Sequence, residues 1–156
     1  MVYQNPDDPI GATPVTRRIL DLVERHADEL AKGWLAEINS DATTPTHGRF
    51  ADNAELYRRG HRIFGQIGQW INQDLTRDDL QKYWTTVGEQ RRVEGFPLSE
   101  IVQSLGLIRK HFWQKVETEG LLDTAADMCQ AMELHNRVTL YFDRAIYFLV
   151  LGYEKS

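Results

Sequence analysis

Apolar residues in this chain recur every three or four positions over long stretches, the spacing that places them on one face of an α-helix. No stretch of useful length alternates apolar and polar residues, as a β-strand with one buried face would. The pattern therefore predicts an all-α protein, with helices over residues 14–39, 51–73, 76–95, 97–120 and 123–156.

The ends of the predicted helices carry residues that commonly begin or stop a helix. Polar side chains can accept hydrogen bonds from the free N–H groups of a first turn, and proline fits the first helical position. The expected starts are Pro14, the capping boxes Asp52–Glu55 and Thr76–Asp79, Pro97 and Asp123. A polar loop is expected over 40–49, and Gly95-Phe96-Pro97 is the clearest break. Gly65 and Gly68 lower helix propensity, a cost that close packing of another helix would offset.

Composition limits the classes of function. The 156 residues, 42% of them hydrophobic, suffice for one domain whose core needs no disulfide or metal. Only one residue is cysteine, which excludes an internal disulfide. The balance of 18 Lys and Arg against 23 Asp and Glu gives a net charge of -5, which disfavours a nucleic-acid surface or a polybasic membrane face. The longest apolar run, 145–151, is too short to cross a bilayer. We therefore expect a cytoplasmic protein.

Sequence motifs for common enzyme chemistry are missing. The chain has no phosphate-binding P-loop, no dinucleotide-binding glycine motif and no serine nucleophile elbow. It also lacks the HExxH zinc motif and the Glu-x-x-His pairs of di-iron helical bundles. We therefore expect no catalysis, no bound metal and no cofactor.

Arg91 is the most unusual residue on the predicted helix faces, because it continues an inner apolar stripe that includes Trp84. A buried guanidinium without a partner is too costly to persist. Arg91 should therefore pair with a carboxylate, lie at an exposed rim or hold an anionic ligand, and the ion pair is favoured.

Two histidines, His26 and His135, also interrupt apolar stripes. His135 lies in the segment ELHNRV, which is similar to the phosphoacceptor box of some bacterial histidine kinases. Its place on an apolar stripe predicts a buried or pocket-lining side chain instead. We expect Arg91, Trp84, His26 and His135 to line a ligand pocket.

The last two predicted helices carry more apolar surface than a small monomer should bury or expose. The final helix has two adjacent apolar lines, the first being Met128, Met132, His135, Thr139, Phe142, Ile146 and Leu149. The second is Leu134, Val138, Tyr141, Ala145 and Phe148. This surplus predicts a homodimer in which both copies contribute the two helices to a four-helix bundle. We assign Leu105, Phe112, Tyr141 and Phe148 to its interface.

The segment 87–97, VGEQRRVEGFP, resembles the turn after the proximal helix of globin-coupled sensors. In those proteins the haem-ligating histidine is followed by Gly and Pro before the next long helix. Arg91 falls at the position of that histidine. A guanidinium is protonated at every relevant pH and has no lone pair to give to iron. The resemblance therefore implies a globin-like domain without haem.

From Ile19 to Tyr153 the chain resembles the non-haem globin-like sensor domain at the N-terminus of stressosome RsbR proteins, the RsbT co-antagonist N-terminal family. The similarity is strongest over 95–117, GFPLSEIVQSLGLIRKHFWQKVE, and includes the final helix, LHNRVTLYFDRAIYFLVLGYEKS. It implies a domain that dimerises and passes a signal through a continuing helix to an output domain of STAS or histidine-kinase type. It carries no ligand residues over to this chain.

We expect a disordered tail over 1–12, a globin-like sensor domain over 13–150 and the start of a helical linker over 151–156. The expected function is non-catalytic signal transduction in a stress response, with a small apolar or anionic ligand as a candidate signal. Two alternatives stay open. One is a haem- or tetrapyrrole-binding sensor that uses His26, His61 or His135, and the other is a small helical enzyme with an apolar pocket.

Overall fold

The computed structural model describes residues 14–119 and 124–156 of the chain. This part is all-α, as predicted, and contains six helices and no strand. They are α1 (Pro14–Ser40), α2 (Pro45–Arg49), α3 (Asn53–Ile71), α4 (Arg77–Val93), α5 (Leu98–Thr118) and α6 (Ala125–Lys155). The predicted tail over 1–12 and the predicted cap Asp123 lie outside the described residues.

Capping boxes begin two of the long helices. The hydroxyl of Thr76 accepts a hydrogen bond from the N–H of Asp79 at 3.2 Å, and the Asp79 carboxylate accepts one from the N–H of Thr76 at 2.8 Å. Thr124 and Asp127 do the same at the start of α6, one residue later than the predicted cap. The short helix α2 lies inside the predicted loop, because Pro45 is compatible with a first helical turn.

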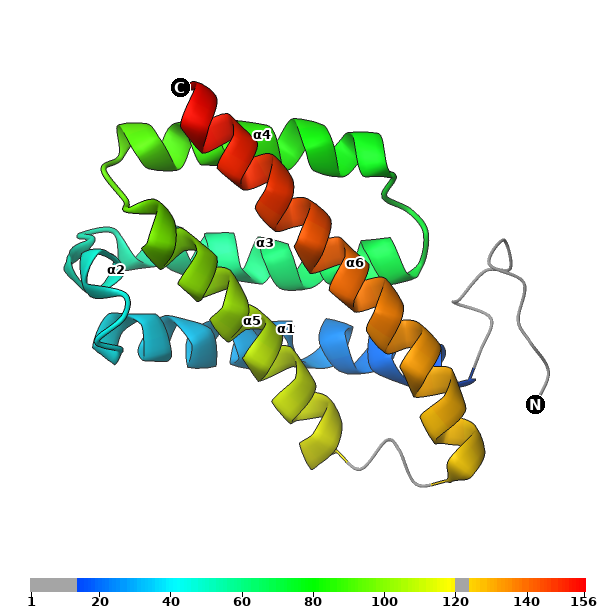
Figure 1. Cartoon of the computed structure of the whole chain (residues 1–156). Coiled ribbons are helices and arrows are strands. Elements are labelled where there is room, and N and C mark those ends of the chain that lie inside the picture. The colour runs from blue at the N-terminus through cyan, green and yellow to red at the C-terminus, as the bar shows by residue number, and fades with distance from the viewer. Residues whose placement is uncertain (1–13, 120–123) are drawn as a thin grey trace.

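The helices form two layers, as Figure 1 shows. α1, α3 and α4 run alongside one another in one layer, and α5 and α6 cross over them in the other. The core lies between the layers, and its largest fully buried side chains include Trp84, Tyr141, Phe64, Phe96, Phe112 and Phe142. None of the described helices combines the length and the hydropathy that a membrane span requires.

α4 and α6 share the most extensive contact of any two helices, and their backbones meet where Gly88 crosses Gly152. A Cβ atom added to Gly88 would lie 2.1 Å from the carbonyl oxygen of Leu149. One added to Gly152 would lie 2.1 Å from the carbonyl oxygen of Thr85. Any larger residue at either position would have to separate the two helices, because interiors are close-packed.

The predicted break over 95–97 closes α4 and ties it to α6. Gly95 has a φ of 86°, which glycine adopts without strain, and the N–H of Phe96 donates to the carbonyl of Arg91 at 3.0 Å. Phe96 is 1% exposed, and its own carbonyl accepts a hydrogen bond from the hydroxyl of Tyr153 at 2.8 Å. The turn therefore connects the end of α4 to the C-terminal part of α6.

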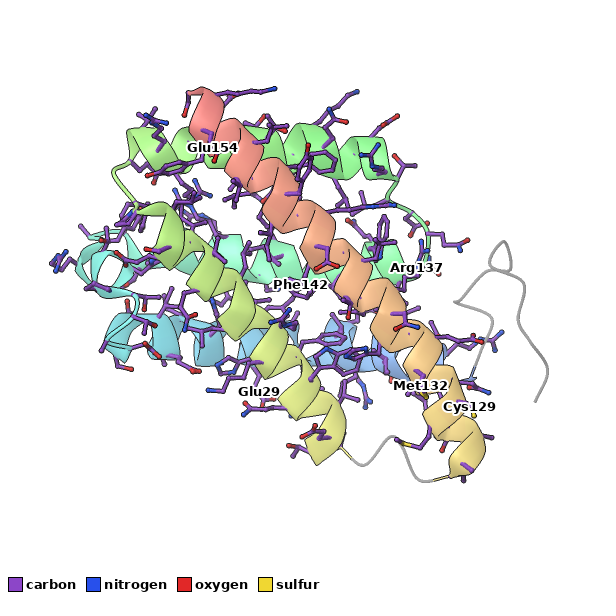
Figure 2. All side chains as sticks on the ribbon, viewed as in Figure 1. Glu29, Cys129, Met132, Arg137, Phe142 and Glu154 are labelled. Carbon is purple, nitrogen blue, oxygen red and sulfur yellow. The ribbon has the colours of Figure 1, made fainter. Side chains whose placement is uncertain are left out.

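Of the two apolar lines predicted along α6, the core takes the second. The buried residues of that line are Leu134, Val138, Tyr141, Ala145 and Phe148. Met128 and Met132 from the first line are 50% and 67% exposed. Figure 2 shows Phe142, in contrast, on the side of α6 that faces α5, where it is buried. The first line is therefore split between the core and the surface.

The four residues predicted for a dimer interface lie in the core of the single chain. Leu105, Phe112, Tyr141 and Phe148 are each at most 2% exposed. Packing within one copy already covers these side chains, so a second copy could reach them only if the domain opened. An interface between folded copies would have to use other residues.

Candidate functional site

A groove separates α3 from α4, two helices that share few or no close backbone contacts. Its volume is about 650 Å³, within the usual range of small-molecule sites. Its apolar wall includes Leu75, Tyr83 and Val87. Its charged lining residues are Glu55, Arg62, Asp74, Asp79, Lys82 and Arg91. The groove thus combines an apolar surface with side chains of both charges.

A smaller inner cavity adjoins the groove, since Tyr83, Val87 and Arg91 line both. The inner cavity has a volume of about 40 Å³, which is room for about one or two water molecules. Trp84 and His47 are among its other lining residues. Both spaces therefore meet along α4 between Tyr83 and Arg91.

Arg91 forms the ion pair that the sequence analysis favoured. Its side chain is 12% exposed, and its Nη1 donates to Oε1 of Glu94 at 2.7 Å. Burial lowers the pKa of Arg91, the charge of Arg59 lowers it further, and Glu94 opposes both. Trp84, which is 1% exposed, lies beside Arg91 in the lining of the inner cavity. The structure therefore brings together two of the four residues predicted for a pocket.

The carboxylate of Glu94 connects α3 to the end of α4. Its Oε2 accepts a hydrogen bond from Nη2 of Arg59 at 2.8 Å, while its Oε1 is bound to Arg91. Arg59 also donates from Nε to Glu55 at 3.2 Å, but its buried Nη1 has no acceptor among the described residues. Two guanidinium groups therefore share one carboxylate at this end of the groove.

A buried pair that the sequence analysis missed, His47 and Glu100, joins α2 to the first turn of α5. Glu100 is 5% exposed and accepts hydrogen bonds from the N–H of Thr46 at 2.7 Å and from the N–H of His47 at 3.4 Å. Nδ1 of His47 also lies 3.4 Å from the same carboxylate oxygen. Burial raises the pKa of Glu100, but the hydrogen bonds from Thr46 and His47 outweigh it, so the pKa lies below its usual value.

The protein should become less stable as the pH is lowered, because of His47. Burial lowers the pKa of this histidine below its usual 6.5, Glu100 opposes that shift, and the charges of Arg91 and Arg59 reinforce it. The unfolded chain therefore binds a proton at a higher pH than the folded chain does. The stability that neutral His47 contributes is complete above about pH 6.5 and is lost as the pH falls toward the lower pKa of the folded state.

Urea unfolding between about pH 7.5 and about pH 5 tests this dependence, with a His47→Gln variant as the comparison. The free energy of unfolding of the unmodified chain should drop more steeply over this range than that of the variant. Parallel curves for the two proteins would show that His47 titrates alike in the folded and unfolded states.

The two predicted pocket histidines lie elsewhere. His26 is at the surface of α1, where its Nδ1 is 3.0 Å from the Glu29 carboxylate. His135 is exposed rather than buried, and its ring centroid lies 5.3 Å from that of Trp113. Neither lines the groove or the inner cavity. The prediction that His135 is buried is wrong, because α6 buries its other apolar line. The argument that burial excludes a phosphoacceptor role for His135 is therefore also wrong.

The described residues do not fit a haem group. Arg91 has no lone pair for iron and is bound to Glu94. His47 is the histidine of the inner cavity, but that cavity of about 40 Å³ is far too small for a tetrapyrrole. His61 is exposed on α3, and no group of three His, Cys, Asp or Glu residues in the described chain is placed to hold a metal ion.

Comparison with known protein families supports the resemblance that the sequence shows. The sequence matches the family described as the RsbT co-antagonist protein rsbRD N-terminal domain over residues 28–156. That range includes α2 to α6, the groove and the inner cavity. A comparison with curated proteins gives no match. Because the family match extends over most of the sequence, the chain belongs to this family of stressosome-type sensor domains in signalling.

Proposed function

We propose that the chain is the sensor domain of a cytoplasmic, non-catalytic signalling protein. It dimerises, receives a signal in its helical body and passes it through α6 to an output domain of STAS or histidine-kinase type. The family supports this role, because an RsbR-type domain acts with downstream stressosome components. The observation that carries the proposal is a set of solvent-accessible apolar side chains on α5 and α6.

This surface, the outer face, is defined by Val102, Gly106 and Trp113 on α5 and by Leu140, Tyr147 and Val150 on α6. Leu140 is 38% exposed and Tyr147 is 60% exposed, whereas the other three apolar side chains are half-buried. Gly106 has open space where a Cβ atom would stand, which lets a neighbouring helix approach closely. Since α5 and α6 form one layer (Figure 1), a two-fold contact here would produce a four-helix bundle.

α4 and α6 are joined at two places, which supports α6 as the path of the signal. One place is the close crossing of Gly88 with Gly152. The other is near the end of α6, where Nη1 of Arg92 donates to the carbonyl of Tyr153 at 2.8 Å. In contrast, α3 meets α4 mainly across the groove. A signal that shifts α4 against α3 would therefore also shift α6.

Sedimentation tests the dimer. The unmodified chain should be a dimer at tens of micromolar, and the double variant Leu140→Glu/Tyr147→Glu should dimerise at least about tenfold more weakly. The reason is that charged groups would have to enter an apolar contact without partners. Circular dichroism should show unchanged helix content, because both side chains are exposed in the single chain.

Val93→Glu provides a matched control, since Val93 is 85% exposed and lies on α4, away from the outer face. This variant should sediment as the unmodified chain does. A monomeric unmodified chain would refute the proposed dimer. A double variant that dimerises as well as the control would refute the outer face as its interface.

A further inference from the structure

We propose that the groove between α3 and α4 binds a small organic carboxylate, which is attracted by the cations Arg62, Lys82 and Arg91 of the lining and whose apolar body lies against Tyr83 and its neighbours. The groove alone supports a binding site for the carboxylate. The further statement that this carboxylate is the signal rests on the proposed sensor function.

The lining carboxylates are already engaged with the protein. Asp79 accepts a hydrogen bond from the N–H of Thr76 at 2.8 Å, as part of the cap of α4. Asp74 accepts one from the side-chain amide of Asn72 at 2.9 Å. Glu55 also forms short ion pairs, with Arg58 at 2.7 Å and with Arg59 at 3.2 Å. These acids therefore attract a further cation less than their number suggests.

The lining cations, in contrast, have capacity left. The side chains of Arg62 and Lys82 form no hydrogen bond or ion pair with any residue that the structure describes, and Lys82 interacts with Asp79 only through its charge. Arg91 uses only Nη1, in its bond to Glu94, and its other two nitrogen atoms bind no acceptor in the described chain. Burial lowers the pKa of Arg91 most, and repulsion from Arg59 across the shared carboxylate lowers it further. An added carboxylate would accept hydrogen bonds from the nitrogen atoms of Arg91 that have no acceptor.

The shape of the groove favours an organic anion over an inorganic one. Leu75 and Tyr83 are half-buried and Val87 is 8% exposed, so together they offer an apolar wall beside the cations. A volume of about 650 Å³ exceeds what a phosphate ion needs. A carboxylate on a short aliphatic or aromatic body would use both kinds of surface, because burial of its apolar body adds to the charge contact.

Isothermal titration with phenylacetate and with octanoate, each compared with its uncharged amide, tests the site. At least one carboxylate should bind, and its amide should bind about tenfold more weakly. The double variant Arg62→Gln/Lys82→Gln should weaken carboxylate binding about five- to tenfold. The double variant Arg25→Gln/Lys32→Gln removes the same charge from exposed positions on α1 and should leave binding within about twofold.

Three results would overturn the proposal: binding of neither carboxylate, equal binding of a carboxylate and its amide, or equal loss in the two double variants. Sedimentation of the same proteins separates this proposal from the sensor function. The groove variants leave the outer face intact, so they should remain dimers even if no carboxylate binds. A chain that binds carboxylate but is monomeric would retain the site and lose the proposed dimer.

Discussion

Replacing Gly152 with alanine should lower the free energy of unfolding by about 3 kcal/mol, even though alanine favours a helix over glycine by up to about 1 kcal/mol. The added methyl group would lie 2.1 Å from the carbonyl oxygen of Thr85 and 2.9 Å from its carbonyl carbon. Both are backbone atoms, so no side-chain rotation can relieve the overlap. α4 and α6 would have to separate along their most extensive contact. Thermal unfolding should show a melting temperature lower by about 6–12 °C.

Gly65→Ala is the matched control for this prediction. Gly65 is exposed in the middle of α3, and a Cβ atom there would meet nothing within 4 Å. This variant should raise the free energy of unfolding by about 0.5–1 kcal/mol, through helix propensity alone. Equal effects of alanine at the two positions would contradict the close crossing of α4 and α6.

The glycines of the helices show what the sequence could and could not predict. Gly65 and Gly68 were expected to permit close packing, because they interrupt an amphipathic helix. The close backbone contact lies instead at Gly88 and Gly152, which are 64 positions apart in sequence. Helix existence and helix ends depend on spacing within a few residues, so they were predicted well. A crossing point depends on how two distant helices are placed, which no local pattern records.

The orientation of α6 also depends on contacts between helices that are distant in sequence. Both apolar lines along this helix satisfy the helical spacing, and hydrophobicity alone does not distinguish them. The close contact of Gly152 with α4 sets which face of α6 points into the core. Leu134 and Tyr141 are therefore buried, and Met132 is exposed. The predicted interface residues Tyr141 and Phe148 consequently lie in the core, and the dimer prediction moves to the outer face.

The candidate site was predicted only where its signal is local. Arg91 stood out because a cation continued an apolar stripe, and its partner Glu94 is three positions away, the spacing of neighbours on a helix. Arg62 and Lys82 carried no such signal. They come together only because α3 and α4 lie on opposite sides of the groove.

Replacing Glu100 with alanine should lower the free energy of unfolding by about 3–4 kcal/mol. This carboxylate acts as a cap for α2 from a different helix, since Thr44 at the N-cap of α2 makes no side-chain capping bond. It accepts hydrogen bonds from the N–H and the hydroxyl of Thr46 and from the N–H of His47. Alanine would leave these donors without their acceptor at a site where Glu100 is 5% exposed and His47 is 5% exposed. Urea unfolding at neutral pH measures the loss.

Glu100→Gln separates the hydrogen bonds from the charge. The amide keeps one acceptor oxygen, so this variant should lose only about 1–2 kcal/mol. It should also remove a pH dependence: the pKa of Glu100 lies below its usual 4.5, so its charge stabilises the fold above about pH 4.5 and this contribution is lost as the pH falls through the lower folded pKa. Below about pH 4 the unmodified chain should therefore lose stability more steeply than Glu100→Gln. A loss of under about 1 kcal/mol in Glu100→Ala would mean that the buried carboxylate does not hold α2 against α5.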